Sequence, residues 1–336
     1  MDSDSKLENS TKHKPLVSVL MAVYNGGDYL KLALESILNQ TYSNLEILIR
    51  NDCSTDDTLK ILKGYAEKDP RIKIFSNEEN LGYLKTMNRL FKQVNGQFFT
   101  TQDADDISKP TRIEEQINLL TSDPEMAICG LNYTLIDSNG EKIESHKQIF
   151  TEPTEIKEVL KKDFALRCGK TMAKKEVLDQ IGFYREFFLK LGYEDYDWLA
   201  RASINFKIGY VPKELYLYRV HHSAVREWIK GQPTYGDDLI RFLLQQRIKY
   251  GTDGLDSDGT LKLEFDQYFK KFDEDYRSNP ITHVMRYESK VALNKKQYLK
   301  SFTINFQAIK KAPFQFRNYK NLVYCTYIIT RRILKV

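Results

Sequence analysis

The first hundred residues alternate between short apolar runs and longer amphipathic segments, and this alternation constrains the fold more than any other feature. Four runs are rich in β-branched and aliphatic residues, as buried strands of a parallel sheet are. They are LVSVLMAV (16–23), LEILIR (45–50), RIKIF (71–75) and QFFTTQ (97–102). The segments between them have apolar residues at helical spacing, and Asp28 is the expected N-cap of the first helix. They are DYLKLALESILNQ (28–40), STDDTLKILKGYAEKD (54–69) and YLKTMNRLFKQV (83–94). Strands and helices in alternation predict an open, doubly wound α/β sheet.

Beyond the fourth strand the regular alternation ends, and the pattern later becomes helical. The segments that come first predict both helices and strands. They are TRIEEQINLLTSD (111–123, helix), AICGLNYTLID (127–137, strand), EIKEVLKKDF (155–164, helix) and FKIGYVPKELYLYRVH (206–221, two short strands around Pro212). DDLIRFLLQQRIKY (237–250) and much of 261–312 have helical spacing with few strand signals. We therefore expect a disordered lead-in over 1–14, an α/β domain over 15–225 and a mainly helical extension over 226–336.

Composition excludes several classes of protein. A chain of 336 residues with 41% hydrophobic residues can bury a sizeable core. No run approaches the ~20 apolar residues that a membrane-spanning helix needs. The polar start MDSDSKLENSTKHK lacks the apolar core of a secretory signal. The scattered cysteines form no CxxC pair, which fits a reduced cytoplasm and argues against a zinc site or a disulfide framework. They are Cys53, Cys129, Cys168 and Cys325.

The positive charge of the chain is concentrated in its last fifty residues. The net charge is +5, but 289–336 contains eleven Lys and Arg and no Asp or Glu, which leaves 5 − 11 = −6 for the rest. The apolar run LVYCTYII (322–329) within this tail is too short to span a membrane. Two interpretations remain open: the tail lies on an anionic membrane surface, or it packs as a terminal helix on the α/β domain.

Polar clusters follow three of the predicted strands, at the sheet edge where open α/β folds bind ligands. They are YNGGD (24–28), RNDCSTDDT (50–58) and QDADD (102–106). Turn geometry accounts for Asn25 with its two glycines, and helix capping accounts for Ser54 to Asp57. Asp52 precedes those caps at the strand tip, where a carboxylate can accept hydrogen bonds from a base or a ribose.

Asp103 and Asp105 form a D-x-D triplet directly after the fourth strand. Water at a turn can solvate such acids, so the triplet alone is a weak signal. Hard divalent cations such as Mg²⁺ and Mn²⁺ also take carboxylate and phosphate oxygens, and they bridge substrate phosphates through one or two protein carboxylates. At the ligand edge of a sheet, the triplet is therefore a candidate cation site for a bound diphosphate.

Together with later motifs, these clusters resemble glycosyltransferase family 2 over about residues 15–225. The later motifs are NEENLGYLKTMNRL (77–90), GYEDYDWLARA (192–202) and YRVHHS (218–223). Members of this family are inverting, nucleotide-sugar-dependent enzymes with a GT-A fold. The resemblance thus implies a Rossmann-like, open mixed sheet flanked by helices, here with a helical C-terminal extension.

On the donor side, the resemblance implies contacts with the nucleotide and with a metal, Mn²⁺ or Mg²⁺. The nucleoside would lie by Tyr24, Asn25 and Asp52. Asp103 would lie near the ribose or the metal, and Asp105 would carry the metal on the diphosphate. Asp106 is expected to cap the following turn instead.

Arg219 and His221 resemble the segment that closes over the diphosphate and the metal. Neighbouring residues of a strand point to opposite faces, so at most one of His221 and His222 faces the site; the YRVH register favours His221.

On the acceptor side, Asp195 resembles the general base that takes a proton from the acceptor hydroxyl, with Glu194 beside it. Three readings stay open here: Asp195 as the base, Glu194 or Asp197 in that role, or acids that only complement a helix dipole. Lys174 and Lys175 stand where relatives often have arginine, which leaves the acceptor contacts open.

The resulting expectation is a metal-assisted, inverting transfer of one sugar, with UDP-sugars as the favoured donors. The acceptor would be a glycan or a lipid-linked saccharide of a bacterial surface polysaccharide or glycolipid. The enzyme would be cytoplasmic, with possible peripheral attachment at the inner face of the cell membrane. Absence of a QxxRW motif argues against a processive synthase. The alternatives are a sugar nucleotidyltransferase and a non-catalytic nucleotide-sugar or membrane-binding protein. The sequence contains no motif for nucleic-acid binding or for a dinucleotide oxidoreductase.

Overall fold

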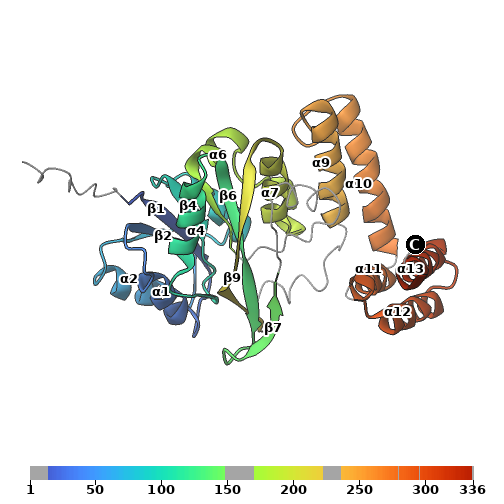
Figure 1. Cartoon of the computed structure of the whole chain (residues 1–336), viewed down its shortest axis with the longest axis horizontal. Coiled ribbons are helices and arrows are strands. Elements are labelled where there is room, and N and C mark those ends of the chain that lie inside the picture. The colour runs from blue at the N-terminus through green and yellow to red at the C-terminus, as the bar shows by residue number, and fades with distance from the viewer. Residues whose placement is uncertain (1–13, 148–169, 222–235, 279, 295, 335–336) are drawn as a thin grey trace, which may run out of the picture. The chain divides into compact units, whose positions relative to one another are not determined.

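The computed structural model describes residues 14–147, 170–221, 236–278, 280–294 and 296–334. The chain divides into two compact units (Figure 1). The first contains residues up to Lys190 together with Glu194–Ala224, and the second contains Leu191–Tyr193 and Val225–Val336. The lead-in expected over 1–14 and the helix expected over 155–164 fall almost wholly outside the described residues.

The first unit is built on a mixed, nine-stranded sheet with the order β3-β2-β1-β4-β8-β6-β9-β5, and β7 pairs with β6. The strands are β1 (Val17–Val23), β2 (Leu45–Asn51), β3 (Ile72–Ser76), β4 (Phe98–Thr101), β5 (Ile107–Ser108), β6 (Met126–Ile136), β7 (Lys142–His146), β8 (Met172–Lys174) and β9 (Lys207–Arg219). Strands β1 to β4 run parallel, whereas β8 is antiparallel to both β4 and β6. The expectation of an open mixed sheet is confirmed.

Helices cover both faces of this sheet because alternate residues of each buried strand point to opposite sides. On one face, Val17, Val19 and Met21 of β1 pack in one cluster with apolar residues of three helices. Those helices are α1 (Leu30–Leu38), α2 (Thr58–Ala66) and α4 (Arg112–Ser122). On the other face, the Phe99 ring lies 5.8 Å from Phe91 and 5.9 Å from Trp198. These two rings belong to α3 (Tyr83–Phe91) and α7 (Glu194–Asn205).

Two local expectations are corrected. Helix α1 begins at Leu30 with Tyr29 as its N-cap, so Asp28 lies in the preceding turn and does not cap the helix. The segment around Pro212 forms one thirteen-residue strand, β9, and not two short strands. Its pairing with β6 shifts register between Val211 and Glu214, so the proline lies in a bulge, where its missing N–H costs no ladder hydrogen bond.

The second unit, as far as it is described, consists mainly of helices. They are α9 (Gly236–Tyr250), α10 (Thr260–Ser278), α11 (Pro280–Asn294), α12 (Tyr298–Lys311) and α13 (Phe316–Leu334). The last three pack on one another. Among the described helices, none has a stretch long and apolar enough to cross a lipid bilayer. The remaining described elements, α6 (Lys175–Ile181) and a 3₁₀ turn (Glu186–Lys190), belong to the first unit.

Candidate functional site

The loop after β4, which carries the QDADD sequence, is shaped by its own hydrogen bonds. The amide of Gln102 donates to the carbonyl oxygens of Asp103 (3.1 Å) and Asp106 (3.0 Å), and Ser108 Oγ donates to Gln102 Oε1 at 2.6 Å. The backbone N–H of Asp103 donates to the hydroxyl of Tyr216 on β9. Backbone and side-chain amide contacts thus hold the loop with its three acids at the carboxyl end of β4.

The end of β9 lies against this loop, as the predicted pairing of D-x-D and YRVH motifs requires. His221 Nε2 is 2.9 Å from Asp105 Oδ2, and Arg219 Nε donates to the carbonyl oxygen of Asp105 at 2.8 Å. Burial raises the pKa of the Asp105 carboxyl, and the charge of Asp103 adds to the rise, whereas the His221 contact lowers it. Asp105 and His221 therefore form one polar pair drawn from two distant parts of the sequence.

Asp106 differs from the expectation that it caps the following turn. Its side chain is buried, and Oδ1 accepts a hydrogen bond from the backbone N–H of Arg219 at 2.7 Å. Burial raises its pKa well above the usual range, and Asp103 and Asp105 raise it further. The carboxyl group therefore fastens the end of β9 to the β4 loop.

Arg219 is itself engaged by the protein. Its side chain is only 2% exposed, its NH1 donates to the carbonyl oxygens of Asp137 and Ser138, and its guanidinium lies 4.5 Å from the centre of the Tyr29 ring. The Tyr29 ring also lies 4.9 Å from the His221 ring. In this arrangement Arg219 links the β4 loop to the carbonyl groups at 137–138, and its assignment to the diphosphate stays a prediction.

Lys170 is a site residue that sequence reasoning missed. It precedes β8, and its Nζ lies 2.5 Å from Asp103 Oδ2. Burial lowers the pKa of Lys170, but Asp103 and Asp106 outweigh burial and leave the pKa raised. Gln116 of α4 fixes the lysine backbone by donating to its carbonyl oxygen at 3.0 Å. No local sequence pattern identifies Lys170, because it meets Asp103 only when β8 inserts beside β4 in the folded sheet.

Glu194 and Asp195 begin α7 and belong to the same group of charges. Burial raises the pKa of Glu194 to about 8, with a further contribution from Asp195. The Asp195 side chain is accessible to solvent but crowded by protein, and this crowding raises its pKa, whereas Lys170 lowers it. The electrostatic influence of Lys170 and Asp103 on Asp195 places the acceptor-side acids and the D-x-D loop in one electrostatic cluster.

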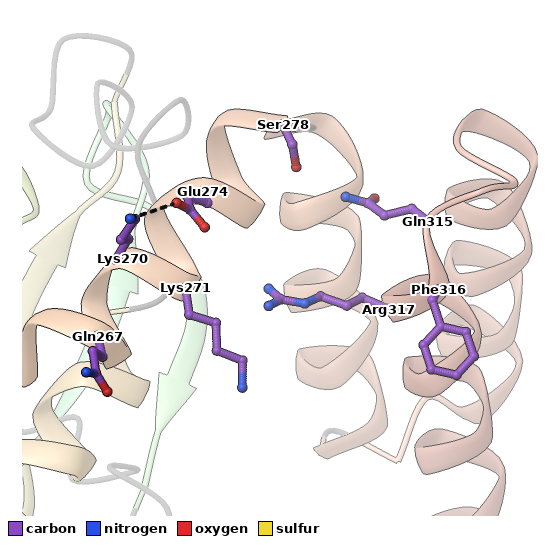
Figure 2. A pocket seen from close by; sticks show the side chains of 8 residues that line it. All are labelled: Gln267, Lys270, Lys271, Glu274, Ser278, Gln315, Phe316 and Arg317. Atoms are coloured by element: carbon purple, nitrogen blue, oxygen red, sulfur yellow. Dashed lines mark ion pairs between the residues drawn. The ribbon is translucent and has the colours of Figure 1, made fainter. Parts of the chain in front are cut away.

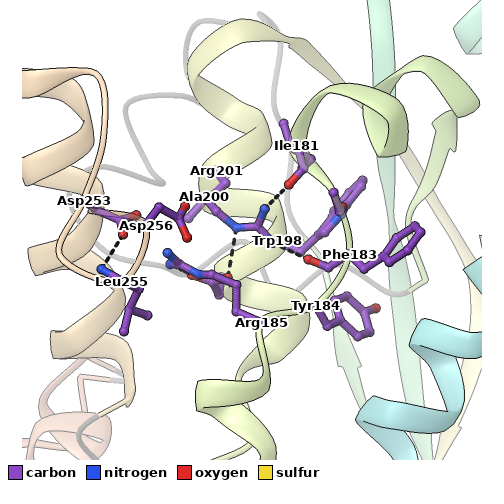
Figure 3. A network of polar contacts seen from close by, with 12 residues as sticks. Ile181, Phe183, Tyr184, Arg185, Trp198, Ala200, Arg201, Asp253, Leu255 and Asp256 are labelled. Carbon is purple, nitrogen blue, oxygen red and sulfur yellow. Dashed lines mark hydrogen bonds and ion pairs between the residues drawn. The ribbon is translucent and has the colours of Figure 1, made fainter. Parts of the chain in front are cut away.

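Asp197, one of the alternatives for the base, is occupied structurally. It is 1% exposed and lies between Arg185 and Arg201, each of which donates from Nε at 3.0 Å. Arg201 also donates to the carbonyl oxygens of Ile181 and Phe183 (Figure 3), and Trp198 Nε1 donates to the carbonyl oxygen of Gly182 at 3.0 Å. This network ties the start of α7 to the segment 181–185 and leaves Asp197 no role in proton transfer.

The loops after β1 and β2 hold each other. Asn25, in a left-handed conformation with φ +48°, accepts from the backbone N–H of Thr55 at 2.9 Å, and its own N–H donates to Ser54 Oγ at 2.9 Å. The expected helix caps thus serve the neighbouring loop, and α2 has Asp57 as its N-cap without a side-chain cap bond. Tyr24 lies beside this pair, half exposed.

Asp52 is buried below these loops. Its Oδ1 accepts from Asn77 Nδ2 (2.8 Å) and from the N–H of Leu81 (2.9 Å), and its Oδ2 accepts from the N–H of Gly82 (2.9 Å). At 3% exposure it fixes the peptide at 81–82 before α3. A nucleoside base would therefore meet the loop that Asp52 holds.

The residues of the β4 loop suit a hard cation. Asp105 offers a carboxylate and His221 an imidazole, and Asp103 Oδ1 is buried with no hydrogen-bond partner in the described parts of the chain. Within those parts, no three His, Cys, Asp or Glu side chains gather into a metal-binding group. A cation that bridges substrate phosphates needs only one or two protein carboxylates, so this donor set fits Mg²⁺ or Mn²⁺ with phosphate oxygens as further ligands.

Comparisons with known proteins identify the family and the fold. The family model for glycosyl transferase family 2 matches residues 18–182. An uncharacterized glycosyltransferase of Methanocaldococcus jannaschii is 30% identical over 210 residues, which are 62% of this chain and 71% of the relative. One from Haemophilus influenzae is 43% identical over 116 residues (34% and 36%), and a putative glycosyltransferase of Bacillus subtilis is 36% identical over 127 residues (38% and 46%). The match thus spans less than half of the latter two relatives.

Solved structures share the fold. Staphylococcus aureus TarS (residues 1–349), in complex with UDP-GlcNAc, gives a TM-score of 0.57 at 20% identity over 88% of this chain and 80% of that chain. The mannosyltransferase PcManGT from Pyrobaculum calidifontis, in complex with GDP-Man and Mn²⁺, gives 0.52 at 16% identity over 96% and 87%. At these identities the likeness concerns the fold.

Proposed function

The chain belongs to glycosyltransferase family 2 and has the GT-A fold, and from that premise we propose that it transfers a single sugar, with inversion, from a nucleotide-diphosphate sugar to a hydroxyl of a glycan or lipid-linked acceptor. One observation supports the proposal most directly: Lys170 pairs with Asp103 of the D-x-D loop at 2.5 Å, and its charge also acts on Asp195 at the start of α7. A single displacement at one carbon requires donor-side and acceptor-side groups to act on the same site.

The donor would lie along the carboxyl edge of β1, β2 and β4. Asn25 with the half-exposed Tyr24, and the 81–82 peptide that Asp52 fixes, are the proposed contacts for the nucleoside. Asp105 and His221 would hold Mn²⁺ or Mg²⁺, with Asp103 Oδ1 beside them. When bound, the cation supplies positive charge that stabilises the departing diphosphate. UDP-sugars are the proposed donors; of the two solved structures described above, one holds UDP-GlcNAc and the other GDP-Man.

Asp195 is the proposed general base. Asp197 is saturated by two guanidinium groups, and the pKa of Glu194 is raised to about 8, which keeps much of its population protonated at neutral pH. Crowding by the protein leaves the pKa of Asp195 raised, which strengthens it as a proton acceptor, and Lys170 counters part of that rise. Asp195 is also accessible to solvent, as a group that must meet an acceptor should be.

The reaction follows from this placement. The acceptor hydroxyl oxygen attacks the anomeric carbon from the face opposite the nucleotide, and the bond between that carbon and the diphosphate oxygen breaks. The hydroxyl proton passes to Asp195, which needs to approach within ~3 Å of the hydroxyl. Arg219 and Asp106 organise the site before the reaction, because they hold the end of β9, which leads to His221, against the β4 loop.

The proposal also covers the product and the cellular location of the enzyme. The product is assigned to a bacterial surface polysaccharide or glycolipid, made at the inner face of the cell membrane by an enzyme attached there peripherally. The basic, aromatic C-terminal helices support this location, with eleven Lys and Arg and no acids after residue 288.

A panel of nucleotide sugars, assayed for release of the nucleoside diphosphate with and without Mn²⁺ or Mg²⁺, tests the proposal. The expected result is release from one or a few donors that requires the divalent cation and a hydroxyl acceptor. Incorporation of a sugar phosphate with release of pyrophosphate would instead establish a nucleotidyltransferase. Absence of any turnover across the panel, with or without glycan acceptors, would leave a binding protein and overturn the proposal.

A further inference from the structure

Helix α13 packs with polar residues inside, contrary to the usual arrangement of a helix in water. Asn318, Asn321 and Cys325 occupy successive positions of its buried seam, at spacings of three and four residues. Asn318 accepts from Arg286 NH1 at 2.6 Å, and Asn321 donates to Asn305 Oδ1 at 2.7 Å. Hydrogen bonds between helices therefore provide part of the packing of α13, beside the apolar contacts of Cys325 and Ile329, and several of its larger apolar residues stay on the opposite side.

The outer face of α13 carries those apolar residues. Phe316 is 70% exposed, Val323 67% and Tyr327 57%, with Tyr319 and Tyr324 beside them. They repeat at helical spacing along one side of α13, together with basic residues. We call this set the outer stripe. Basic side chains lie over two of its rings: Lys320 is 5.2 Å from the centre of Phe316, and Arg331 is 5.9 Å from that of Tyr327.

The positive charge of the C-terminal segment limits which partners can cover the outer stripe. The segment 289–336 carries eleven Lys and Arg and no Asp or Glu. A second copy of the chain docked through this face would bring like charges together, which opposes such a dimer. Aromatic rings flanked by Lys and Arg are typical of a helix lying in the interface of an anionic bilayer, where each basic residue near the surface strengthens binding roughly fivefold.

A basic pocket adjoins the start of the outer stripe. It lies between α10 and the beginning of α13, and Phe316 is one of its lining residues. Figure 2 shows Lys271 and Arg317 reaching into this pocket from the two helices. Lys270 also lines it and lies 3.8 Å from Glu274, so the residues that line the pocket include three cations and one carboxylate. Such a lining suits the phosphate of a lipid headgroup.

We propose that the outer stripe of α13 docks on the surface of an anionic phospholipid bilayer, with a headgroup phosphate in the pocket formed by Lys271 and Arg317. The apolar side chains enter the boundary between headgroups and acyl chains, and the helix lies along the membrane without crossing it. This attachment concerns a surface outside the α/β site, and it holds whatever donor the enzyme uses.

Sedimentation of the full-length chain with vesicles tests the proposal. Vesicles that contain phosphatidylglycerol should bind at least ~10-fold more tightly than pure phosphatidylcholine, and 0.5 M salt should reduce binding because surface charges are screened. The stripe variant Phe316→Ser/Val323→Ser/Tyr327→Ser should bind at least ~10-fold more weakly. The pocket variant Lys271→Ala/Arg317→Ala should lose roughly 10-fold or more, on anionic vesicles only.

The matched control replaces three exposed apolar residues elsewhere, Ile143, Ile248 and Leu263, by serine. It should bind as the wild type does. Thermal unfolding followed by circular dichroism identifies any variant that has lost its fold, and the pocket variant supplies a second test if the stripe variant has. Failure of the wild type to bind anionic vesicles, or equal binding by the folded stripe and pocket variants, would overturn the proposal. A wild-type dimer in light scattering that the stripe variant abolishes would assign the face to a second copy instead.

Discussion

The loops after β1 and β2 and the loop after β4 lie on the same edge of the sheet but are held in different ways. In the first region the acids and hydroxyls serve the protein: Asp52 accepts three hydrogen bonds, and Ser54 and Thr55 hold Asn25. In the second region charges face one another, and Asp103 Oδ1 is buried without a hydrogen-bond partner among the described residues. In the first region, these acids and hydroxyls find their hydrogen-bond partners within the protein. In the second region, positive charge that a ligand brings would stabilise the crowded carboxylates.

This difference predicts that substitutions in the second region reduce turnover, whereas substitutions in the first reduce stability. The largest effect is expected for Asp195→Asn, because an amide cannot accept the hydroxyl proton. Turnover should fall about 10²- to 10⁴-fold with little change in the melting temperature. Steady-state assays with the best donor measure the loss. Asp179→Asn, an exposed acid of α6, is the matched control and should retain full activity. Wild-type turnover by the Asp195 variant would place the base elsewhere.

The next largest effect is expected for Asp105→Asn. It removes the carboxylate that we assign to the cation, so turnover should fall roughly 10²-fold, in line with the loss of one charge-stabilising group. Binding of Mn²⁺ to the enzyme–nucleotide complex, followed by electron paramagnetic resonance without any sugar transfer, should weaken in parallel. If Mn²⁺ binds the variant as tightly as the wild type, the cation is held by other groups.

Lys170→Met tests the electrostatic link between the β4 loop and Asp195 at the start of α7. Burial raises the pKa of Asp195 and Lys170 lowers it, so loss of the ammonium group raises that pKa further. Because the base must be deprotonated, the rise of activity with pH should move to higher pH. At neutral pH we therefore expect reduced turnover, with recovery in alkaline buffer. Lys60→Met, which replaces an exposed lysine of α2, is the control. An unchanged pH profile would restrict Lys170 to a structural role.

The sequence predicted the sheet because its evidence is local. Near-continuous apolar runs such as LVSVLMAV and LEILIR become β1 and β2, which are almost wholly buried. The meeting of Asp105 with His221 was also predictable, since both motifs belong to a family whose order along the chain is recognisable.

Other parts depend on contacts distant in sequence. Lys170 reaches Asp103 only through the insertion of the three-residue strand β8 between β4 and β6. Local capping rules also failed for Asp106, because the N–H of Arg219, 113 residues away, is its hydrogen-bond donor. Such partners leave no periodicity or spacing in the sequence.

Asp52→Asn is expected to have the smallest effect on turnover and tests the first region directly. The asparagine keeps one acceptor oxygen, but its NH₂ group is a donor. It must face either the backbone N–H of Gly82, or the backbone N–H of Leu81 and the side-chain amide of Asn77. A buried donor left unsatisfied costs about 1–3 kcal/mol, so the free energy of unfolding in urea should fall by that amount. Asp57→Asn, an exposed acid in the same region without a side-chain cap bond, should stay within about 0.5 kcal/mol of the wild type. Substrate KM should rise only as far as the 81–82 peptide shifts. A stable variant with greatly reduced nucleotide affinity would mean that Asp52 contacts the nucleoside itself, and the contrast between the two regions would then fail.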